Sequence, residues 1–186
     1  MIGCLPTSLQ VNDKTIPIRS DYRVALTILE AYNDDELKET ELIEIVLACL
    51  YTEEIELDDY EEAFNQAIWF LNCGDSVSKP QTSKPLYSWE QDEQMIFSAI
   101  NKVAGKEIRQ LEYLHFWTFI GLFNELGEGL FSTVVSIRKK KQKGQKLEKW
   151  EKEFCIQNPD LVTLKKKYTK DEQDTLDWFD KLIGAK

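Results

Sequence analysis

Few residues in this chain of 186 have the type and spacing that catalysis requires. The chain contains one histidine, His115, which lies in its most aromatic stretch beside Phe116 and Trp117. Nucleophilic triads and zinc sites place histidine beside a second reactive group, and no such spacing surrounds this one. We therefore expect His115 to pack in the protein core, with a functional role as the minor alternative.

Two groups of acidic residues could in principle bind Ca²⁺ or Mg²⁺: Asp58-Asp59 and Asp34-Asp35-Glu36. Neither follows the alternating pattern of an EF-hand loop, and acidic residues at helix starts are explained by the helix dipole. The phosphate-binding patterns G-x-x-x-x-G-K-S/T and G-x-G-x-x-G do not occur. We expect no metal, no cofactor and no enzyme activity, although carboxylates brought together from distant helices are an open alternative.

The four cysteines, Cys4, Cys49, Cys73 and Cys155, are widely separated and show no C-x-x-C spacing. Cys49 and Cys73 lie among apolar residues of predicted helices, where a free thiol behaves as a small hydrophobic group. The first residues contain neither a basic region nor a long apolar run, so no secretory signal is predicted. We expect a reduced protein of the cytosol.

Charge is unevenly distributed along the chain. The net charge of −10 argues against general nucleic-acid binding, which depends on neutralising phosphates. Residues 30–62 contain fourteen acidic residues and one lysine, whereas residues 138–152 contain eight basic and two acidic residues. Such asymmetry usually reflects solvated faces, and less often an oriented contact with a partner.

Two stretches are candidate partner-binding surfaces. The first is a basic run that contains Arg138, Lys139, Lys140, Lys141 and Lys143. It is either a solvated helix end or a docking surface for an acidic partner or RNA. The second is formed by apolar residues of the last predicted helix: Leu176, Trp178, Phe179 and Ile183. That helix either packs back on the protein or fits into a groove of a partner.

The elements that must position these residues are predicted to be helical, apart from one hairpin. Alternation of apolar and polar residues over 8–18, around Asn12-Asp13, indicates a short β-hairpin. A first helix is capped by Ser20 and stops near Asn33. Further helices are predicted at about residues 36–51, 59–73, 89–104, 108–126, 131–146, 147–156 and 169–183. Gly105 is expected to end the helix that starts near residue 89.

Residues 108–126 are predicted to form the helix around which the others pack. Nearly every face of this helix is apolar, yet Glu112 and His115 interrupt it and it is too short to span a membrane. The predicted fold is therefore all-α, a compact helical bundle with a short N-terminal β-hairpin and a charged helical C-terminal extension. Residues 1–137 would form the core domain, and residues 138–186 an extension that is not an independent domain.

Five stretches, in this order, are similar to those of a known family: SDYR (20–23), WFLNCG (69–74), YSWEQDEQMIFSAI (87–100), LEYLHFWTFIGLF (111–123) and IR (137–138). Together they resemble the bacteriophage "gene product fifteen" family of Gram-positive phages and prophages, over about residues 9–138. Two features depart from the family pattern. Phe116 stands where a tryptophan is expected, and the chain continues beyond Pro159.

The resemblance implies a place in the tail-morphogenesis module of long-tailed phages, between the tail-tube and tape-measure genes. Tail assembly chaperones encoded there coat the tape-measure protein and recruit the tail-tube protein around it. The implied function is a non-enzymatic chaperone in the host bacterial cytoplasm, with these two proteins as partners, no membrane association, and a homo-oligomer as a further option. The alternatives are a structural tail or head–tail component of the virion and a nucleic-acid-binding regulator that uses the basic run.

Overall fold

The computed structural model describes residues 3–34, 36–75 and 85–165. The elements are, in order, β1 (Ser8–Val11), β2 (Lys14–Pro17), α1 (Tyr22–Ala31), α2 (Glu39–Leu50), the 3₁₀ helix η1 (Leu57–Asp59), α3 (Tyr60–Leu71), α4 (Glu93–Ala104), the 3₁₀ helix η2 (Ile108–Gln110), α5 (Phe116–Asn124), α6 (Leu130–Gln142), α7 (Lys149–Gln157) and α8 (Pro159–Val162). The mostly helical class with an N-terminal hairpin is confirmed.

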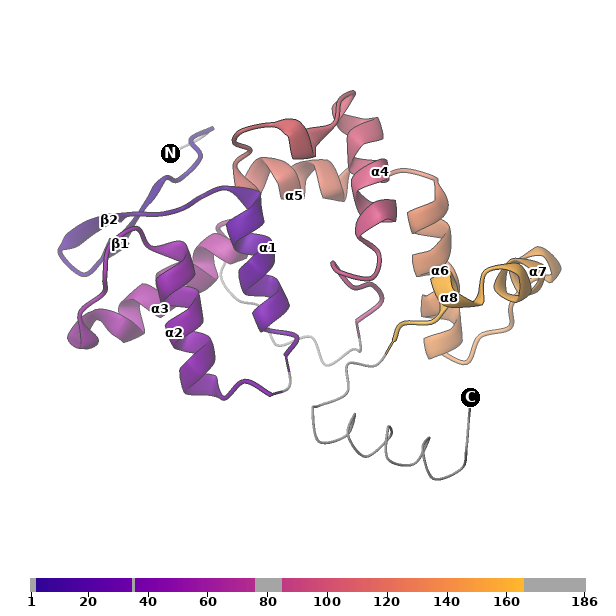
Figure 1. Ribbon diagram of the computed structural model, residues 1–186, viewed down its shortest axis with the longest axis horizontal. Helices are drawn as coiled ribbons and strands as arrows, with labels where there is room; N and C mark the ends of the chain where they lie inside the picture. Colours follow the sequence, from indigo (N-terminus) through magenta and orange to yellow (C-terminus); the bar gives the residue numbers. More distant parts are fainter. Residues whose placement is uncertain (1–2, 35, 76–84, 166–186) are drawn as a thin grey trace, which may run out of the picture.

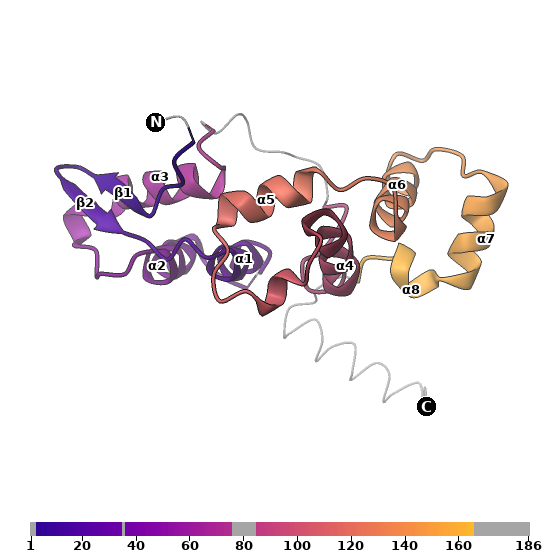
Figure 2. The ribbon, with the colours of Figure 1, turned by 90° about the horizontal axis from the view of Figure 1, so that it is seen from above.

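The helices are distributed along one long axis of the molecule and point in several directions. The arrangement is therefore more extended than the compact bundle predicted from the sequence (Figure 1). The hairpin and α1–α3 lie at one end, α4 and α5 lie in the middle, and α6–α8 lie at the other end. The view from above shows the same order, with α7 farthest from the hairpin (Figure 2). The predicted helix at residues 169–183 lies outside the described residues.

The hairpin has the register that its alternating sequence predicts. Leu9 pairs with Ile16 and Val11 pairs with Lys14, and Asn12 takes a positive φ of 50° in the turn between them. Leu9, Val11 and Ile16 are buried on one face of the hairpin, which packs against α3. The hairpin therefore contributes to the main core and also closes one end of the molecule.

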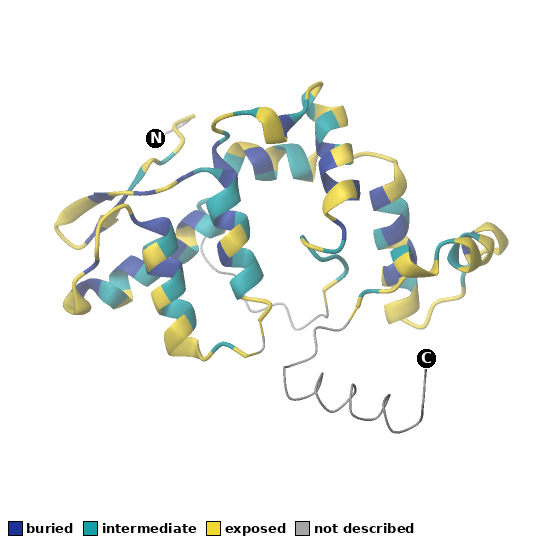
Figure 3. Cartoon of the chain, viewed as in Figure 1, coloured by how far each residue is buried: buried dark blue, intermediate teal, exposed yellow. Residues whose placement is uncertain are grey.

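An aromatic cluster fills the core beneath α5. Tyr22 of α1 stacks on Phe119 of α5 with ring centroids 4.6 Å apart, and Phe97 of α4 lies 6.0 Å from Phe119. Phe70 of α3 lies 5.8 Å from Phe116. Buried residues accordingly line the inner faces of α1, α3, α4 and α5 (Figure 3). This cluster joins the first half of the chain to the second.

The prediction of one central helix over residues 108–126 is wrong. The 3₁₀ helix η2 and a non-helical stretch precede α5, which begins only at Phe116. The Tyr22 N–H donates to the Leu114 carbonyl at 2.9 Å and the Phe116 N–H donates to the Ser20 carbonyl at 2.8 Å. The Asp21 carboxylate accepts from the Leu114 N–H. These long-range bonds hold Leu114 and His115 in an extended conformation, so the helix cannot begin before Phe116.

Two helix starts also differ from prediction. Asp21, not Ser20, caps α1 by accepting from the Arg23 N–H, while the buried Ser20 hydroxyl pairs with Tyr113. The fourth helix begins at Glu93 rather than near residue 89. Gly105 ends α4 with a φ of 68°, as the sequence predicts. Sequence reasoning missed the short helix α8, which begins at Pro159.

Candidate functional site

The basic run occupies the end of α6 and the loop after it, and its first residue is buried. Arg138 is 5% exposed and donates to both carboxylate oxygens of Asp92, at 2.6 and 2.9 Å. Its guanidinium also donates to the carbonyls of Leu86 and Leu161. The prediction that Arg138 belongs to an exposed partner-binding surface is therefore wrong. Arg138 joins α6 to the start of α4 and to α8.

Lys140 is also engaged within the chain. Its ammonium lies 2.6 Å from the carboxylate of Glu151, which is buried in α7. This hydrogen bond lowers the pKa of Glu151 and raises that of Lys140. The other Glu151 oxygen accepts from the Glu148 N–H, at the start of α7. The pair therefore attaches α7 to α6.

Three residues of the basic run remain on the surface. Lys139, Lys141 and Lys143 are exposed and form no ion pair within the described residues. They are the part of the predicted basic surface that a partner could reach. The other candidate residues, Leu176, Trp178, Phe179 and Ile183, lie outside the described residues.

His115 is buried, as the sequence predicts, and both of its ring nitrogens are engaged. Nδ1 accepts from the Trp117 N–H at 3.1 Å and so caps α5. Nε2 then carries the proton and donates to the Pro6 carbonyl at 2.9 Å. His115 therefore starts α5 and holds the segment before the hairpin. The sequence indicated a core position for it but not these two contacts.

A groove of about 470 Å³ lies between α4 and the start of α6. Met95 and Phe131 form its largely buried floor, and Val103 and Leu130 line it with 39% and 50% of their surfaces exposed. Exposed apolar residues on both sides of an apolar floor suit side chains of similar character. We call this feature the α4–α6 groove. Sequence reasoning missed it because its two walls are about thirty residues apart.

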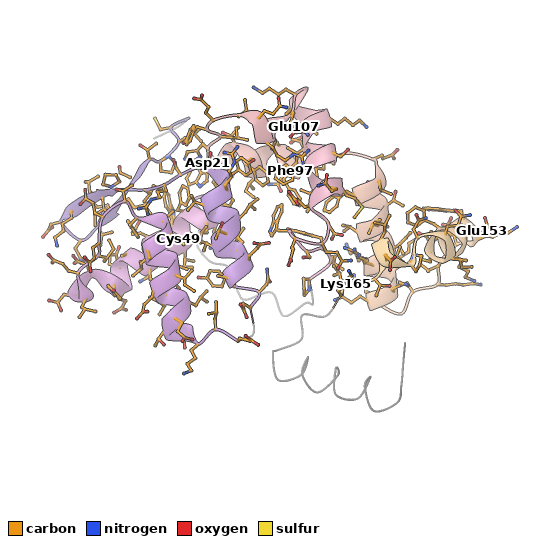
Figure 4. All side chains as sticks on the ribbon, viewed as in Figure 1. Asp21, Cys49, Phe97, Glu107, Glu153 and Lys165 are labelled. Carbon is orange, nitrogen blue, oxygen red and sulfur yellow. The ribbon has the colours of Figure 1, made fainter. Side chains whose placement is uncertain are left out.

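A second cleft, of about 480 Å³, lies between α1 and α4, with Phe97 on its α4 side (Figure 4). Its two arginines already have partners in the chain. Arg23 binds the Asp21 carboxylate and the carbonyl of Leu111, and Arg109 binds the Glu107 carboxylate. The hydrogen bond from Arg109 lowers the pKa of Glu107 to about 2. These ion pairs brace the cleft walls.

The described residues contain no group of three or more histidine, cysteine, aspartate or glutamate side chains placed to hold a metal ion. All four cysteines are free thiols. In the same described part of the chain, no helix has both the length and the apolar character needed to cross a bilayer. Features of the described residues that could bind another molecule include the α4–α6 groove, the cleft beside α1 and the exposed lysines.

The model of the family described as bacteriophage Gp15 protein matches residues 1–169 of the chain. The chain belongs to this family. Among curated proteins and among solved structures, nothing matches. The Gp15 match confirms the resemblance and extends it on both sides of residues 9–138. It includes the stretch just after Pro159 that was expected to depart from the family. Every described residue, including the α4–α6 groove and the Arg138–Asp92 pair, lies within the Gp15 region.

Proposed function

We propose that this Gp15-family protein is a non-enzymatic tail assembly chaperone that acts in the host bacterial cytoplasm. In this role it binds the phage tape-measure protein and promotes assembly of the tail-tube protein around it. Membership of the bacteriophage Gp15 family over residues 1–169 is the observation that carries the proposal. The sequence features that resemble the tail-module family supply the specific role.

The α4–α6 groove is the place where we expect the tape-measure protein to bind. A tape measure is a long amphipathic helix whose apolar stripe would aggregate if left exposed. Helices of this kind bind by placing apolar side chains, spaced one turn apart, in an apolar groove. A groove of about 470 Å³ accommodates a few such side chains. The net charge of −10 supports solubility of the complex.

Co-expression with the tape-measure protein, followed by size-exclusion chromatography with light scattering, tests the proposal. We expect the tape-measure protein to be soluble only when this protein is present, and the two to co-elute. Leu130→Asp with Val103→Asp should abolish co-elution, because both substitutions place a charge in the apolar groove. Leu5→Asp places a charge at an exposed leucine outside the groove and is the control for each single groove substitution. An insoluble tape measure with this protein eluting alone would contradict the chaperone role.

A structural component of the virion is the alternative, and purified phage distinguishes it from a chaperone. A chaperone leaves before the tail is complete, so mature particles should lack the protein. Stoichiometric recovery of the protein from purified virions would favour the structural role.

A further inference from the structure

The two ends of the molecule carry opposite charge, and each end exposes large apolar side chains. We infer that the protein binds a second copy of itself head to tail, with the acidic end of one copy against the basic end of the next. The acidic end is defined by Glu53, Glu54, Leu57, Asp58 and Glu61. The basic end is defined by Lys146, Lys149, Trp150, Lys152 and Ile156.

The acidic end surrounds one exposed leucine. Leu57 in η1 is 81% exposed, the largest exposure among the large hydrophobic residues of the described chain. Residues 53–62 contain seven acidic residues and no basic residue. Lys14 of β2 binds Glu56 and Asp59, at 2.8 and 2.9 Å. The four acidic residues that define the acidic end are exposed and form no ion pair within the described ranges.

The basic end is formed by α7 and the loop that leads into it. Residues 139–157 contain seven lysines and three glutamates, and one of these glutamates, Glu151, is buried against Lys140. Ile156 and Trp150 are 79% and 51% exposed on α7. Glu153 is the acidic side chain at the outer side of this helix (Figure 4). The end therefore combines positive charge with two apolar side chains, the complement of Leu57 in its acidic setting.

The two ends point away from each other along the long axis. The loop before α3 lies beside the hairpin at one end of the molecule, and α7 lies at the opposite extreme in both ribbon views (Figures 1 and 2). One copy cannot join its own acidic end to its own basic end across the helices between them. Two different surfaces on one molecule form a head-to-tail contact, which continues from copy to copy or closes into a ring.

Charge complementarity selects this pairing over acidic-to-acidic or basic-to-basic contact, because like charges brought together repel. The attraction weakens with salt, since the Debye length falls from about 30 Å at 0.01 M to about 10 Å at 0.1 M. Leu57, Trp150 and Ile156 add apolar burial that salt does not screen. We expect self-association that strengthens with protein concentration and weakens, without vanishing, as salt is raised.

Sedimentation of the full chain alone provides the test, so the result does not depend on the proposed chaperone function. An acidic-end variant carries Glu53→Lys, Glu54→Lys and Asp58→Lys. A basic-end variant carries Lys146→Glu, Lys149→Glu and Lys152→Glu. At low salt, wild type should increase in mass with concentration and each variant should stay monomeric. Equal amounts of the two variants should associate when mixed, because the unaltered ends carry opposite charges and the two reversed ends do so as well.

Two further samples complete the experiment. One chain with all six reversals should regain self-association, because the charge pairing is restored with opposite polarity. A control with Glu112→Lys, Glu125→Lys and Glu128→Lys makes the same charge change as the acidic-end variant, at exposed sites away from both ends, and should behave as wild type. Circular dichroism checks that each variant is folded. A monomeric wild type at low salt, or a six-reversal chain that stays monomeric, would overturn the inference.

Discussion

Among single residues, Arg138 is held by hydrogen bonds to three separate parts of the chain. Its guanidinium is buried, faces both oxygens of Asp92 and reaches two backbone carbonyls. Its Nε has no hydrogen-bond partner among the described residues. A buried ion pair gives little net stability compared with apolar residues of the same shape, but removing one partner leaves an unpaired buried charge. The pair therefore specifies how α6 is joined to α4.

Replacing Arg138 with methionine should lower the free energy of unfolding by about 3–5 kcal/mol, because the Asp92 carboxylate stays buried without its partner. Adding Asp92→Leu should recover part of that loss, since neither charge then remains. Urea denaturation measures both changes. Lys139→Met, on the exposed side of the same helix, is the control and should change stability by less than about 0.5 kcal/mol. An Arg138→Met protein as stable as wild type would contradict this account.

The ion pair between Glu107 and Arg109 should make the stability of the protein depend on pH in the acid range. The pKa of its carboxyl is lowered from 4.5 to about 2, chiefly because Arg109 donates to it. A lowered folded-state pKa contributes stability that is complete above pH 4.5 and is lost as the pH falls toward 2. Wild type should therefore resist urea better than Glu107→Gln at pH 7, and the two midpoints should converge by about pH 2. A difference that is the same at pH 3 as at pH 7 would contradict this assignment.

At the scale of elements, the end of α4 depends on a glycine. Gly105 takes a φ of 68°, a left-handed conformation that side chains with a Cβ adopt at a cost. Gly105→Ala should therefore destabilise the protein by about 1–2 kcal/mol, although a Cβ there would meet no atom within 4 Å. Gly127→Ala, which also enters open space but has no positive φ, should be neutral within about 0.5 kcal/mol. Thermal unfolding compares the two, and equal effects would show that backbone conformation is not the cause.

Short sequence patterns correctly predicted the elements whose conformation is set by residues close together in the chain. The hairpin followed from alternation around Asn12, and the end of α4 followed from Gly105. The start of α5 could not be predicted in this way, because it depends on bonds from Ser20 and Tyr22, more than ninety residues earlier. An aromatic run has helical spacing whether or not distant backbone groups hold part of it extended.

In the candidate site, too, some features depend on local sequence and others depend on distant residues. The exposed lysines after Arg138 follow from composition, since isolated charges prefer water. The burial of Arg138 follows from Asp92, which lies 46 residues away and which no local pattern connects to it. The α4–α6 groove likewise joins segments that are distant in the sequence. Sequence alone therefore predicts which residues are charged or apolar, but not which of them face each other.

On the scale of the whole molecule, the groove and the two ends occupy different surfaces. The groove is lined by α4 and the start of α6, which lie between the two extremes of the long axis where the acidic and basic ends are found (Figure 1). Head-to-tail contact would therefore leave the groove open on every copy. Substitutions in the groove and substitutions at the ends should consequently affect tape-measure binding and self-association separately. The groove variant should lose the tape-measure protein, and the end variants should lose self-association.

The Arg138–Asp92 pair also sets an order of events during synthesis. Its two residues are 46 positions apart, and at about 5–20 residues per second a ribosome takes roughly 2–9 s to pass from one codon to the other. Throughout that interval Arg138 has not yet been synthesised. The Asp92 carboxylate therefore stays hydrated, and α4 cannot pack against α6. The side of α4 that packs on α6 is then uncovered. Slow codons between positions 92 and 138 would lengthen this vulnerable period and lower the yield of folded protein.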